Sequence, residues 1–343
     1  MARLIDRLIF VGAGKSPSFD YYFASRLELH AGPALEFYDL DASIGEIDKV
    51  KWRGAFVIFC RYASRRWIRA IKQQADELAG IGLFLDDDIE ALVAFDGIGL
   101  AYKFRLWRRA LRHWPTLLPM LTALWVSTPV LAQRWRSMSP RLLPPIAGAY
   151  DLCEAPAPNP EPLVALHSSA SHVSDQRWLE PVVRGVLAED REICFEVVAD
   201  HAQARRWRGD PRVRVIGAQS WTTYRAETAA NGRHLLLAPL LPSRPNAARA
   251  AVKRIDATRC GAALLVSDPR VYQVSDEEAA LGMVAPLNER GWINSIIGLA
   301  RDDGRRESLK CLNRRALLKA RQAARPLFEW EENGAGGAWR LTE

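Results

Sequence analysis

Three charged side chains in the second half of the chain have spacings that suit a phosphate-rich ligand. After an apolar strand and a loop with Asn246, the pattern predicts a helix over Ala247–Ala257 that bears Arg249, Lys253 and Asp256. Lys253 and Asp256 are three residues apart and share a helix face. Lys253 could neutralise a diphosphate and Asp256 could accept hydrogen bonds from ribose hydroxyls. The same spacing also fits an ordinary ion pair on a solvated helix.

Three consecutive carboxylates follow an apolar run in the first half of the chain. Phe84–Ile89 reads FLDDDI, so a strand runs directly into Asp86, Asp87 and Asp88. Carboxylates at a strand end are costly unless they are solvated, hydrogen-bonded or paired with a cation. Three interpretations stay open: acceptor-binding or general-base residues in a cleft, caps of the following helix, or a D-x-D site for a divalent metal.

Short loops after other expected strands offer further candidates. VGAGK at 11–15 contains Gly12 and Gly14 but lacks the later G-K-[ST] of a phosphate-binding Walker loop. Arg61 ends the third expected strand, either at the same rim or as an ordinary surface arginine.

A loop of small residues, among them Ser168 and Ser169, leads through His172 to a helix that we expect Ser174 or Asp175 to cap. Backbone N–H groups at such a helix start favour a bound anion. Plain strand-to-helix turn chemistry explains the same residues equally well.

The candidate residues belong to two successive series of alternating strands and helices. Short β-branched or aromatic runs alternate with helical patterns, which is typical of parallel sheets with crossover helices. We expect an N-terminal domain at 1–150, a proline-rich linker at 151–162, a second domain at 163–304, and a helix with a fraying tail at 305–343. The expected strands are Asp6–Val11, Ala34–Tyr38, Ala55–Cys60, Gly82–Leu85, Ala123–Ser127, Leu163–Leu166, Cys194–Val198, Val213–Ile216, Leu235–Ala238 and Ala262–Val266.

Composition narrows the class of protein without naming it. The chain has 343 residues, 49% hydrophobic and 25% charged, which suits two globular domains. Its five cysteines form no C-x-x-C pair or metal-ligand spacing, and we find neither a signal-peptide pattern nor a spanning apolar stretch. We therefore expect a cytoplasmic protein. The net charge of +7 suggests nucleic acid, an anionic membrane or a nucleotide diphosphate as partner.

One basic segment could contact a membrane. Lys103–Trp114 reads KFRLWRRALRHW, and Phe104, Trp107, Leu111 and Trp114 fall on one helical face. Tryptophan opposite arginine is the composition of an interfacial helix. The alternative is that this face packs on its own domain. No nucleic-acid-binding motif accompanies the charge.

The segment 234–272 resembles the donor-binding core of family 4-type GT-B glycosyltransferases, in particular bacterial polysaccharide and O-antigen enzymes. The resemblance lies in an apolar strand, A-P-L, N-x-x-R-x-x-x-K-x-x-D, a glycine, a strand, and S-D-x-x-x-Y, and E-R-G-W at 289–292 and LVALHSSASH at 163–172 extend it. It implies two Rossmann-like open parallel-sheet domains facing a central cleft. It also implies that Lys253 contacts the donor diphosphate and Asp256 the ribose. Many relatives carry another acid eight residues earlier, where this chain has Ala248.

Residues and resemblance together give the expected site and activity. The expected activity is transfer of a sugar from a nucleotide diphosphate donor to a carbohydrate or lipid-linked saccharide, without a cofactor. The resemblance implies that the anomeric configuration is retained and that no metal is obligatory. Two alternatives are a catalytically reduced GT-B binding partner and a metal-dependent D-x-D enzyme of the GT-A kind. The expected donor-binding residues are Ser168, Ser169, Asn246, Arg249, Lys253, Asp256 and Tyr272; the acceptor-side residues Gly12, Gly14 and Arg61; and the catalytic residues Asp86, Asp87, Asp88 and His172.

Overall fold

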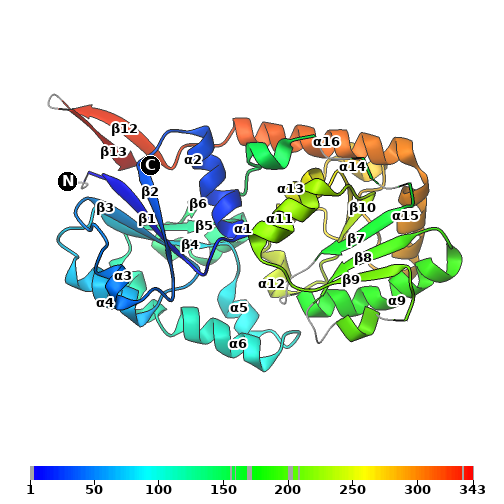
Figure 1. The fold of residues 1–343 in the computed structure, drawn as a ribbon, viewed down its shortest axis with the longest axis horizontal. Helices are drawn as coiled ribbons and strands as arrows, with labels where there is room; N and C mark the ends of the chain where they lie inside the picture. Colours follow the sequence, from blue (N-terminus) through cyan, green and yellow to red (C-terminus); the bar gives the residue numbers. More distant parts are fainter. Residues whose placement is uncertain are drawn as a thin grey trace.

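The chain folds into two α/β lobes, each built on a parallel sheet (Figure 1). The computed structural model describes residues 4–154, 157–158, 160–167, 172–199, 204–207, 209–333 and 336–342. Within them, six parallel strands form the N-terminal sheet in the order β2-β1-β3-β4-β5-β6. These strands are β1 (Arg7–Gly12), β2 (Ala34–Asp39), β3 (Ala55–Cys60), β4 (Gly80–Leu85), β5 (Ala123–Val126) and β6 (Arg141–Leu142).

The second sheet has the order β11-β10-β7-β8-β9 in the described residues, and it is also parallel. Its strands are β7 (Leu163–His167), β8 (Cys194–Val198), β9 (Val213–Ile216), β10 (Leu235–Ala238) and β11 (Ala263–Val266). Two open parallel sheets with crossover helices confirm the predicted GT-B architecture. The expected strands were found within about two residues of their bounds because buried apolar runs are visible in the sequence.

Helices cover both faces of each sheet. In the N-terminal lobe they are α1 (Pro17–Phe19), the π-helical turn η1 (Asp20–Ala24), α2 (Ser25–Leu29), α3 (Ile44–Ile47), α4 (Arg65–Gln73), α5 (Ile89–Ala94), α6 (Leu100–Leu106), the π-helical turn η2 (Trp107–Leu111), α7 (Trp114–Leu117) and α8 (Pro129–Arg134). In the C-terminal lobe they are α9 (Val173–Glu189), α11 (Trp221–Ala230), α12 (Arg244–Ala247), α13 (Val252–Arg259), α14 (Asp276–Ala280) and α15 (Glu289–Arg301).

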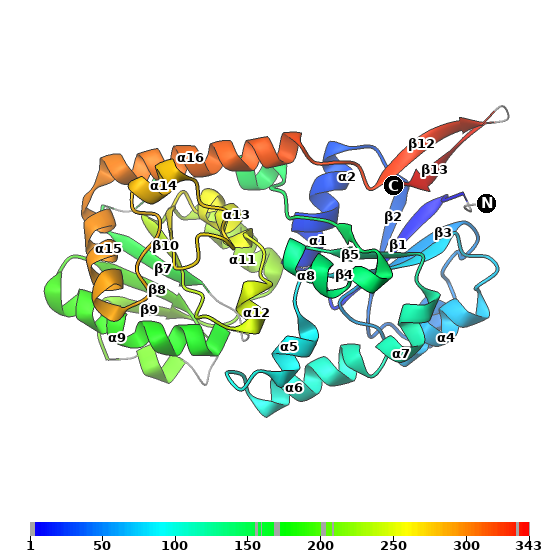
Figure 2. The same cartoon turned by 180° about the vertical axis from the view of Figure 1, so that it is seen from behind.

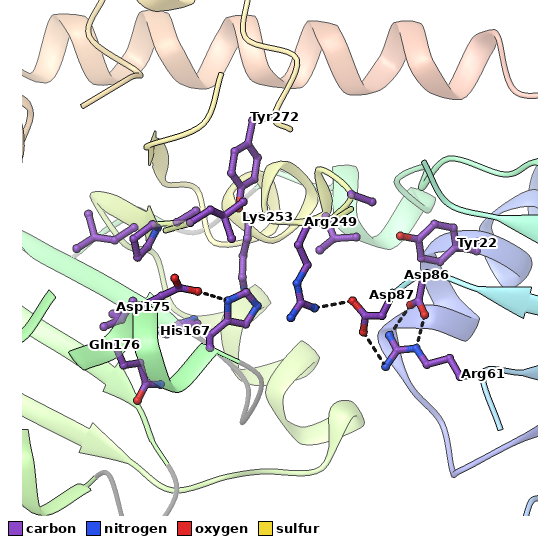
Figure 3. A pocket seen from close by; sticks show the side chains of 18 residues that line it. Tyr22, Arg61, Asp86, Asp87, His167, Asp175, Gln176, Arg249, Lys253 and Tyr272 are labelled. Atoms are coloured by element: carbon purple, nitrogen blue, oxygen red, sulfur yellow. Dashed lines mark hydrogen bonds and ion pairs between the residues drawn. The ribbon is translucent and has the colours of Figure 1, made fainter. Parts of the chain in front are cut away.

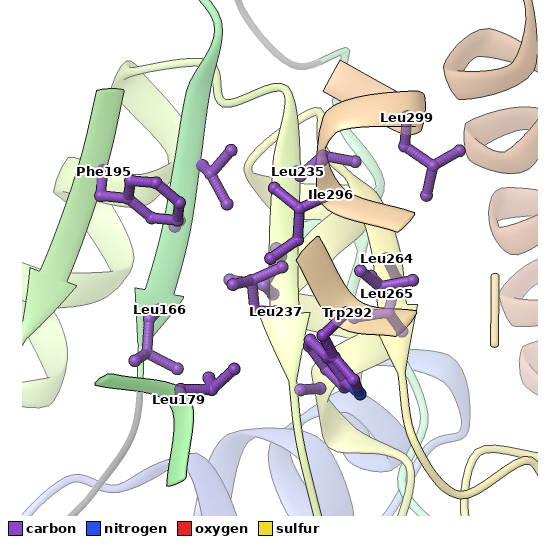
Figure 4. Close-up of a cluster of buried hydrophobic side chains, with 14 of the residues drawn as sticks. Leu166, Leu179, Phe195, Leu235, Leu237, Leu264, Leu265, Trp292, Ile296 and Leu299 are labelled. Atoms are coloured by element: carbon purple, nitrogen blue, oxygen red, sulfur yellow. The ribbon is translucent and has the colours of Figure 1, made fainter. Parts of the chain in front are cut away.

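Alternating side chains build the N-terminal core on two faces. Along β1, Ile9 and Val11 join one buried cluster, while Leu8 and Phe10 join the cluster on the opposite face. In the C-terminal lobe, Trp292 on α15 packs with leucines of β10 and β11 (Figure 4). Each fully buried leucine, isoleucine or phenylalanine contributes about 1.5–3 kcal/mol, so the sheets are rigid supports for the loops at their ends.

The C-terminal segment joins the lobes and corrects the predicted tail. Helix α16 (Asp303–Gln322) runs along the top of the C-terminal lobe and reaches the edge of the N-terminal lobe in Figure 1, with Leu309 in the C-terminal core and Leu317 in an N-terminal cluster. The predicted fraying after it is wrong. The strands β12 (Phe328–Asn333) and β13 (Gly336–Leu341) form an antiparallel hairpin. Cross-strand rings stabilise it: Trp330 and Trp339 have centroids 5.2 Å apart.

Two predicted helices are interrupted. The helix expected over Ala247–Ala257 begins only at Val252, as α13, because Ala247 ends the separate short helix α12 and a turn follows it. There the Ala248 carbonyl accepts a hydrogen bond from Thr128 Oγ1 at 3.1 Å. In Lys103–Trp114, the π-helical turn η2 shifts the helical register, so the predicted single apolar face does not form.

Candidate functional site

The two lobes meet at a small polar pocket between the carboxyl ends of their strands (Figure 3). Its volume is about 100 Å³. This is the edge of an open parallel sheet where ligands usually bind. Among the described residues, the N-terminal lobe supplies Tyr22, Arg61, Asp86 and Asp87, and the C-terminal lobe supplies the polar residues His167, His172, Asp175, Gln176, Arg249, Lys253 and Tyr272.

Asp86 holds Arg61 in place at the end of β3. Arg61 adopts a left-handed backbone conformation (φ 62°), which turns its side chain toward the next strand. Its Nε and Nη2 atoms both bond the Asp86 carboxylate, and Nη2 also donates to Ser18 Oγ at 2.8 Å. Ser18 Oγ in turn donates to Asp86 at 2.6 Å. Burial would lower the pKa of Arg61, but the neighbouring Asp86 and Asp87 raise it above its usual value.

Asp87 connects the two lobes across the pocket. Its carboxylate accepts a charge-assisted hydrogen bond from Arg249 Nη1 at 2.6 Å, and Arg61 Nη1 lies 3.5 Å away (Figure 3). Burial raises the pKa of a carboxyl group, yet Arg249 and Arg61 outweigh it and lower the pKa of Asp87. Asp87 is therefore ionised and engaged by cations from both lobes.

Asp88 has a different position from its two neighbours. It is the N-cap of α5, and its Oδ1 accepts from the Ala91 amide at 2.9 Å. Its other oxygen accepts from Arg134 Nη1 at 2.8 Å. In the described part of the chain, no group of three or more His, Cys, Asp or Glu side chains is arranged to hold a metal ion. The capping interpretation thus applies to Asp88, whereas Asp86 and Asp87 line the pocket.

Asp175 orients His172 on the other side of the pocket. His172 Nδ1 lies 2.8 Å from Asp175 Oδ2. Asp175 Oδ1 also accepts from the Leu241 amide at 3.0 Å and from Asn246 Nδ2 at 3.2 Å. Burial, followed by the nearby Arg249, lowers the pKa of His172, so the ring is neutral near pH 7. Because an ionised carboxylate only accepts, Nδ1 carries the ring proton and Nε2 is left as an acceptor.

This arrangement changes two expectations about the loop before α9. The predicted cap at Ser174 or Asp175 is wrong: His172 is the N-cap residue, without a side-chain cap bond, because the Asp175 carboxylate bonds the 241–246 segment instead. Asn246 lies behind Asp175 and does not line the pocket. Ser168 and Ser169 lie outside the described residues.

Lys253 lines the pocket, but Asp256 does not. Lys253 Nζ and Asp256 Oδ2 form an ion pair at 2.8 Å, as their shared helix face predicts. Asp256 is buried, and its Oδ1 accepts from Tyr21 at 2.5 Å and from Arg259 at 2.7 Å. Burial would raise the pKa of Asp256, but Lys253 and Arg259 depress it. The structure does not bring this carboxylate to the pocket wall, because three partners already bond its two oxygens.

The Tyr21–Asp256 contact belongs to a larger network between the lobes, which the sequence analysis missed. Arg259 donates to Tyr21 Oη at 2.6 Å and to Asp151 at 3.1 Å. Arg225 bonds the same Asp151 carboxylate at 3.1 Å. Asp151, the first residue of the predicted linker, is fully buried. Nothing local marks Asp151 as an interlobe residue, because its arginine partners are 74 and 108 residues away in sequence.

The remaining candidates differ in position. Tyr272 is buried in the pocket wall. Gly12 ends β1 and Gly14 follows it, but neither lines the pocket; the Gly12 carbonyl accepts from the Leu40 amide at 2.8 Å. The sequence analysis missed His167, whose ring nitrogens lie 2.9 Å from Glu196 and 3.1 Å from Tyr224 Oη. Its position at the end of a buried strand was the available signal.

The described helices include none with the length and apolarity needed to cross a bilayer.

The expected apolar face of Lys103–Trp114 is divided between core and surface. Trp114 is buried, whereas Leu100, Phe104 and Trp107 are 82%, 61% and 46% exposed. The exposed rings of Phe104 and Trp107 stack with centroids 5.8 Å apart.

Comparisons with known proteins support the fold. No protein-family model matches the sequence, and no curated protein is significantly similar to it. Among solved structures, Staphylococcus aureus TarM is similar with a TM-score of 0.55 and 11% identity over 80% of this chain and 55% of TarM. A Thermobaculum terrenum O-GlcNAc transferase is similar with a TM-score of 0.52 and 12% identity, over 94% of this chain and 65% of that protein. Anabaena HepE is similar with a TM-score of 0.53 and 14% identity, over 91% of this chain and 95% of HepE.

This chain therefore spans about half to two thirds of the first two proteins and nearly all of HepE. The TarM structure contains UDP, fondaparinux and α-GlcNAc-glycerol, and the HepE structure contains UDP and glucose. At these identities the likeness establishes the two-lobed GT-B fold.

Proposed function

We propose that this chain is a GT-B glycosyltransferase that moves a sugar from a nucleotide diphosphate donor to a carbohydrate or lipid-linked saccharide. The observation that carries the proposal is the meeting of Arg249, Lys253 and the neutral His172 in one interlobe pocket. Two cations beside a neutral histidine suit a donor whose diphosphate leaves as an anion. The bound UDP of the similarly folded TarM and HepE structures supports the same ligand class.

Donor binding would replace the Asp87 carboxylate at Arg249 with the diphosphate of the nucleotide. The Arg249 guanidinium now bonds Asp87, and Lys253 bonds Asp256. A diphosphate offers both cations several acceptor oxygens in place of single carboxylates. A pocket of about 100 Å³ is smaller than the roughly 300–1,000 Å³ of ordinary ligand sites. Admission of a nucleotide sugar therefore requires the Asp87–Arg249 contact to open.

His172 would accept a hydrogen bond from a hydroxyl group of the substrate. With Nδ1 held by Asp175, its Nε2 can accept a hydrogen bond from the sugar or from the acceptor. With retention of configuration, the outcome implied by the resemblance, the departing phosphate takes the acceptor proton and His172 only positions a hydroxyl. With inversion, His172 would itself be the general base. The anomeric configuration of the product, read by NMR, separates the two roles.

A thermal-shift screen against UDP, GDP, ADP and their sugar conjugates tests the proposal. A diphosphate at about a hundred times its Kd stabilises the folded state by roughly 2.7 kcal/mol. We expect at least one nucleoside diphosphate to raise the Tm of the parent chain and to have little effect on an Arg249→Gln, Lys253→Ala double variant. No shift with any of these nucleotides would contradict the proposal.

A second candidate is a catalytically reduced GT-B protein that binds a partner. Two observations favour it. Ala248, which stands where many relatives have an acid, is buried against the N-terminal lobe, and Asp256 already has three partners. Hydrolysis or transfer of a nucleotide sugar by the purified chain would reject this candidate. The D-x-D alternative has less support, because Arg61, Arg249 and Arg134 engage Asp86, Asp87 and Asp88 respectively.

We also propose peripheral contact with an anionic membrane through α6. The exposed Leu100 and Phe104 of α6 and Trp107 at the start of η2 recur at helical spacing. On the same lobe, a surface hollow is lined by the cations Arg65, Arg69, Lys72 and Arg112, with no carboxylate among the described residues of its wall. Exposed aromatic rings and basic side chains on one lobe suit the interface of an anionic bilayer.

A further inference from the structure

A second, larger cavity lies between the lobes beneath α16, on the side where α8 and α12 face one another (Figure 2). Its volume is about 1,110 Å³, enough for a ligand of several sugar units. The walls are the 125–130 and 141–146 segments of the N-terminal lobe, the 247–255 and 268–273 segments of the C-terminal lobe, and the end of α16. Arg249, Ala250 and Tyr272 line this cavity and the candidate donor pocket alike. A ligand here would therefore lie directly beside the donor.

The charge of this cavity is strongly one-sided. Among the described residues of its wall, the only carboxylate is Asp268, whereas the arginines are Arg26, Arg141, Arg249, Arg254, Arg270 and Arg325. Arg249 is paired with Asp87, and Arg254 with Glu278 at 2.7 Å. Arg270 lies 3.7 Å from Asp268. This leaves Arg26 and Arg325 without a carboxylate partner among the described residues, and the excess of positive charge favours an anion.

Arg26 is the most informative of these cations. It is 3% exposed, and its guanidinium donates to the Tyr22 carbonyl at 3.0 Å and to the Pro144 carbonyl at 2.7 Å. No carboxylate in the described part of the chain forms an ion pair with it. Burial lowers its pKa to about 10, which reflects the cost of an uncompensated charge. Buried charges are ordinarily paired, so an anion bound beside Arg26 would relieve this cost.

The remaining surface of the cavity suits a carbohydrate better than a small free ion. Val130 and Leu142 are half exposed at its wall, beside Pro144 and Pro145. Such surfaces can pack against the apolar faces of sugar rings, while the planar arginine fork matches a phosphate or carboxylate group. Arg325 lies in the same wall, is exposed, and has no ion-pair partner in the described residues.

We propose that this cavity is an acceptor subsite for an anionic saccharide, with the anionic group at Arg26 and Arg325. The neutral end of the saccharide then points toward Arg249 and Tyr272, where the two cavities adjoin. This inference rests on the proposed glycosyltransferase function, because it assigns the acceptor of that reaction. It differs from the sequence expectation, which placed acceptor contacts at Gly12, Gly14 and Arg61.

Isothermal titration calorimetry on the whole chain, with and without saturating UDP, tests the subsite. The probes are glucose 1-phosphate and glucuronic acid, which distinguish phosphate from carboxylate as the recognised group, with glucose as the neutral control. We expect at least one anionic probe to bind at least tenfold more tightly than glucose, both with and without UDP. The exposed Arg325→Gln change should weaken that binding at least fivefold without affecting UDP. Arg26→Met should weaken it further, and Arg65→Gln, outside the cavity, should leave it unchanged.

Equal affinities for glucose and both anions would overturn the inference, as would an unchanged affinity in folded Arg325→Gln. Competition between UDP and the anionic probe would also overturn it, because both would then occupy one site. Absence of UDP binding alone would count against the proposed function, whereas the titration without UDP would still decide the subsite.

Discussion

Asp87, at the end of β4, and Arg249, between α12 and α13, are joined at 2.6 Å across the interlobe pocket. This ion pair places the candidate phosphate-binding cation of one lobe on a carboxylate of the other. On the proposed function, Asp87 competes with the donor diphosphate for Arg249, and we expect this contact to weaken when a diphosphate binds. Several expectations depend on this competition.

The Asp87→Asn variant should bind UDP several-fold more tightly than the parent chain, because the amide competes less well for Arg249. Calorimetric titration with UDP measures the change. Asp41→Asn, which removes a surface carboxylate bonded to Arg109, is the matched control and should leave the Kd unchanged. An unaltered or weaker affinity in Asp87→Asn would show that the contact does not oppose donor binding.

Lys253→Ala should weaken UDP binding by about tenfold or more, since one cation beside the diphosphate is lost. Lys253 also forms an ion pair with the buried Asp256. We therefore expect a loss of about 1–3 kcal/mol in the free energy of unfolding, measured in urea. Lys310→Ala, which removes a surface lysine paired with Glu307, should change neither quantity. Equal UDP affinity in Lys253→Ala and the parent would remove Lys253 from the site.

The three consecutive aspartates should support transfer activity without a bound metal ion. Each of Asp86, Asp87 and Asp88 already bonds an arginine, so none has both oxygens open to a cation. Transfer activity should therefore survive dialysis against EDTA. Loss of activity that Mn²⁺ or Mg²⁺ restores would favour the D-x-D alternative.

Glu196 should govern part of the acid unfolding of the C-terminal lobe. Burial opposes its charge, but His167 and Arg233 lower its pKa to about 2. A depressed folded-state pKa contributes stability above the unfolded value near pH 4.3, and this contribution is lost as the pH falls toward 2. Urea unfolding of Glu196→Gln should depend less steeply on pH between about 4.5 and 2 than that of the parent. Parallel curves would contradict the assignment.

Alanine variants of two tryptophans distinguish membrane contact from core packing in this segment. Trp107→Ala should reduce co-sedimentation with anionic vesicles while leaving the Tm nearly unchanged, because the ring is 46% exposed. Trp114→Ala should instead cost roughly 3–5 kcal/mol of stability, because that ring is buried against Trp135. Equal binding of Trp107→Ala and the parent to vesicles would reject the membrane contact.

The strands were predictable from the sequence, whereas the details of the site were not. Buried apolar runs such as Ala55–Cys60 mark strands locally, and their ends correctly located Arg61, Asp86 and Asp87 at the cleft. The position of Asp256 depends on Tyr21, 235 residues away, which no local pattern reveals. The break between α12 and α13 likewise depends on a contact with Thr128.

The predicted fraying of the tail failed for a related reason. Its glycines concealed the cross-strand pairing of Trp330 with Trp339, which stabilises a hairpin only once the chain has turned back on itself. Side-chain pairing that no sequence pattern displays thus decided both the interlobe contacts, which are distant in sequence, and the hairpin at the end of the chain, which is local.

The most direct test of the account is a calorimetric comparison of UDP and UMP on the parent chain and on Arg249→Gln. If the interlobe pocket binds a nucleotide diphosphate through Arg249 and Lys253, the parent should bind UDP, or another diphosphate from the screen, at least tenfold more tightly than the corresponding monophosphate. Arg249→Gln should lose most of that preference. Equal affinities of the parent for diphosphate and monophosphate, or an unchanged preference in Arg249→Gln, would contradict the account.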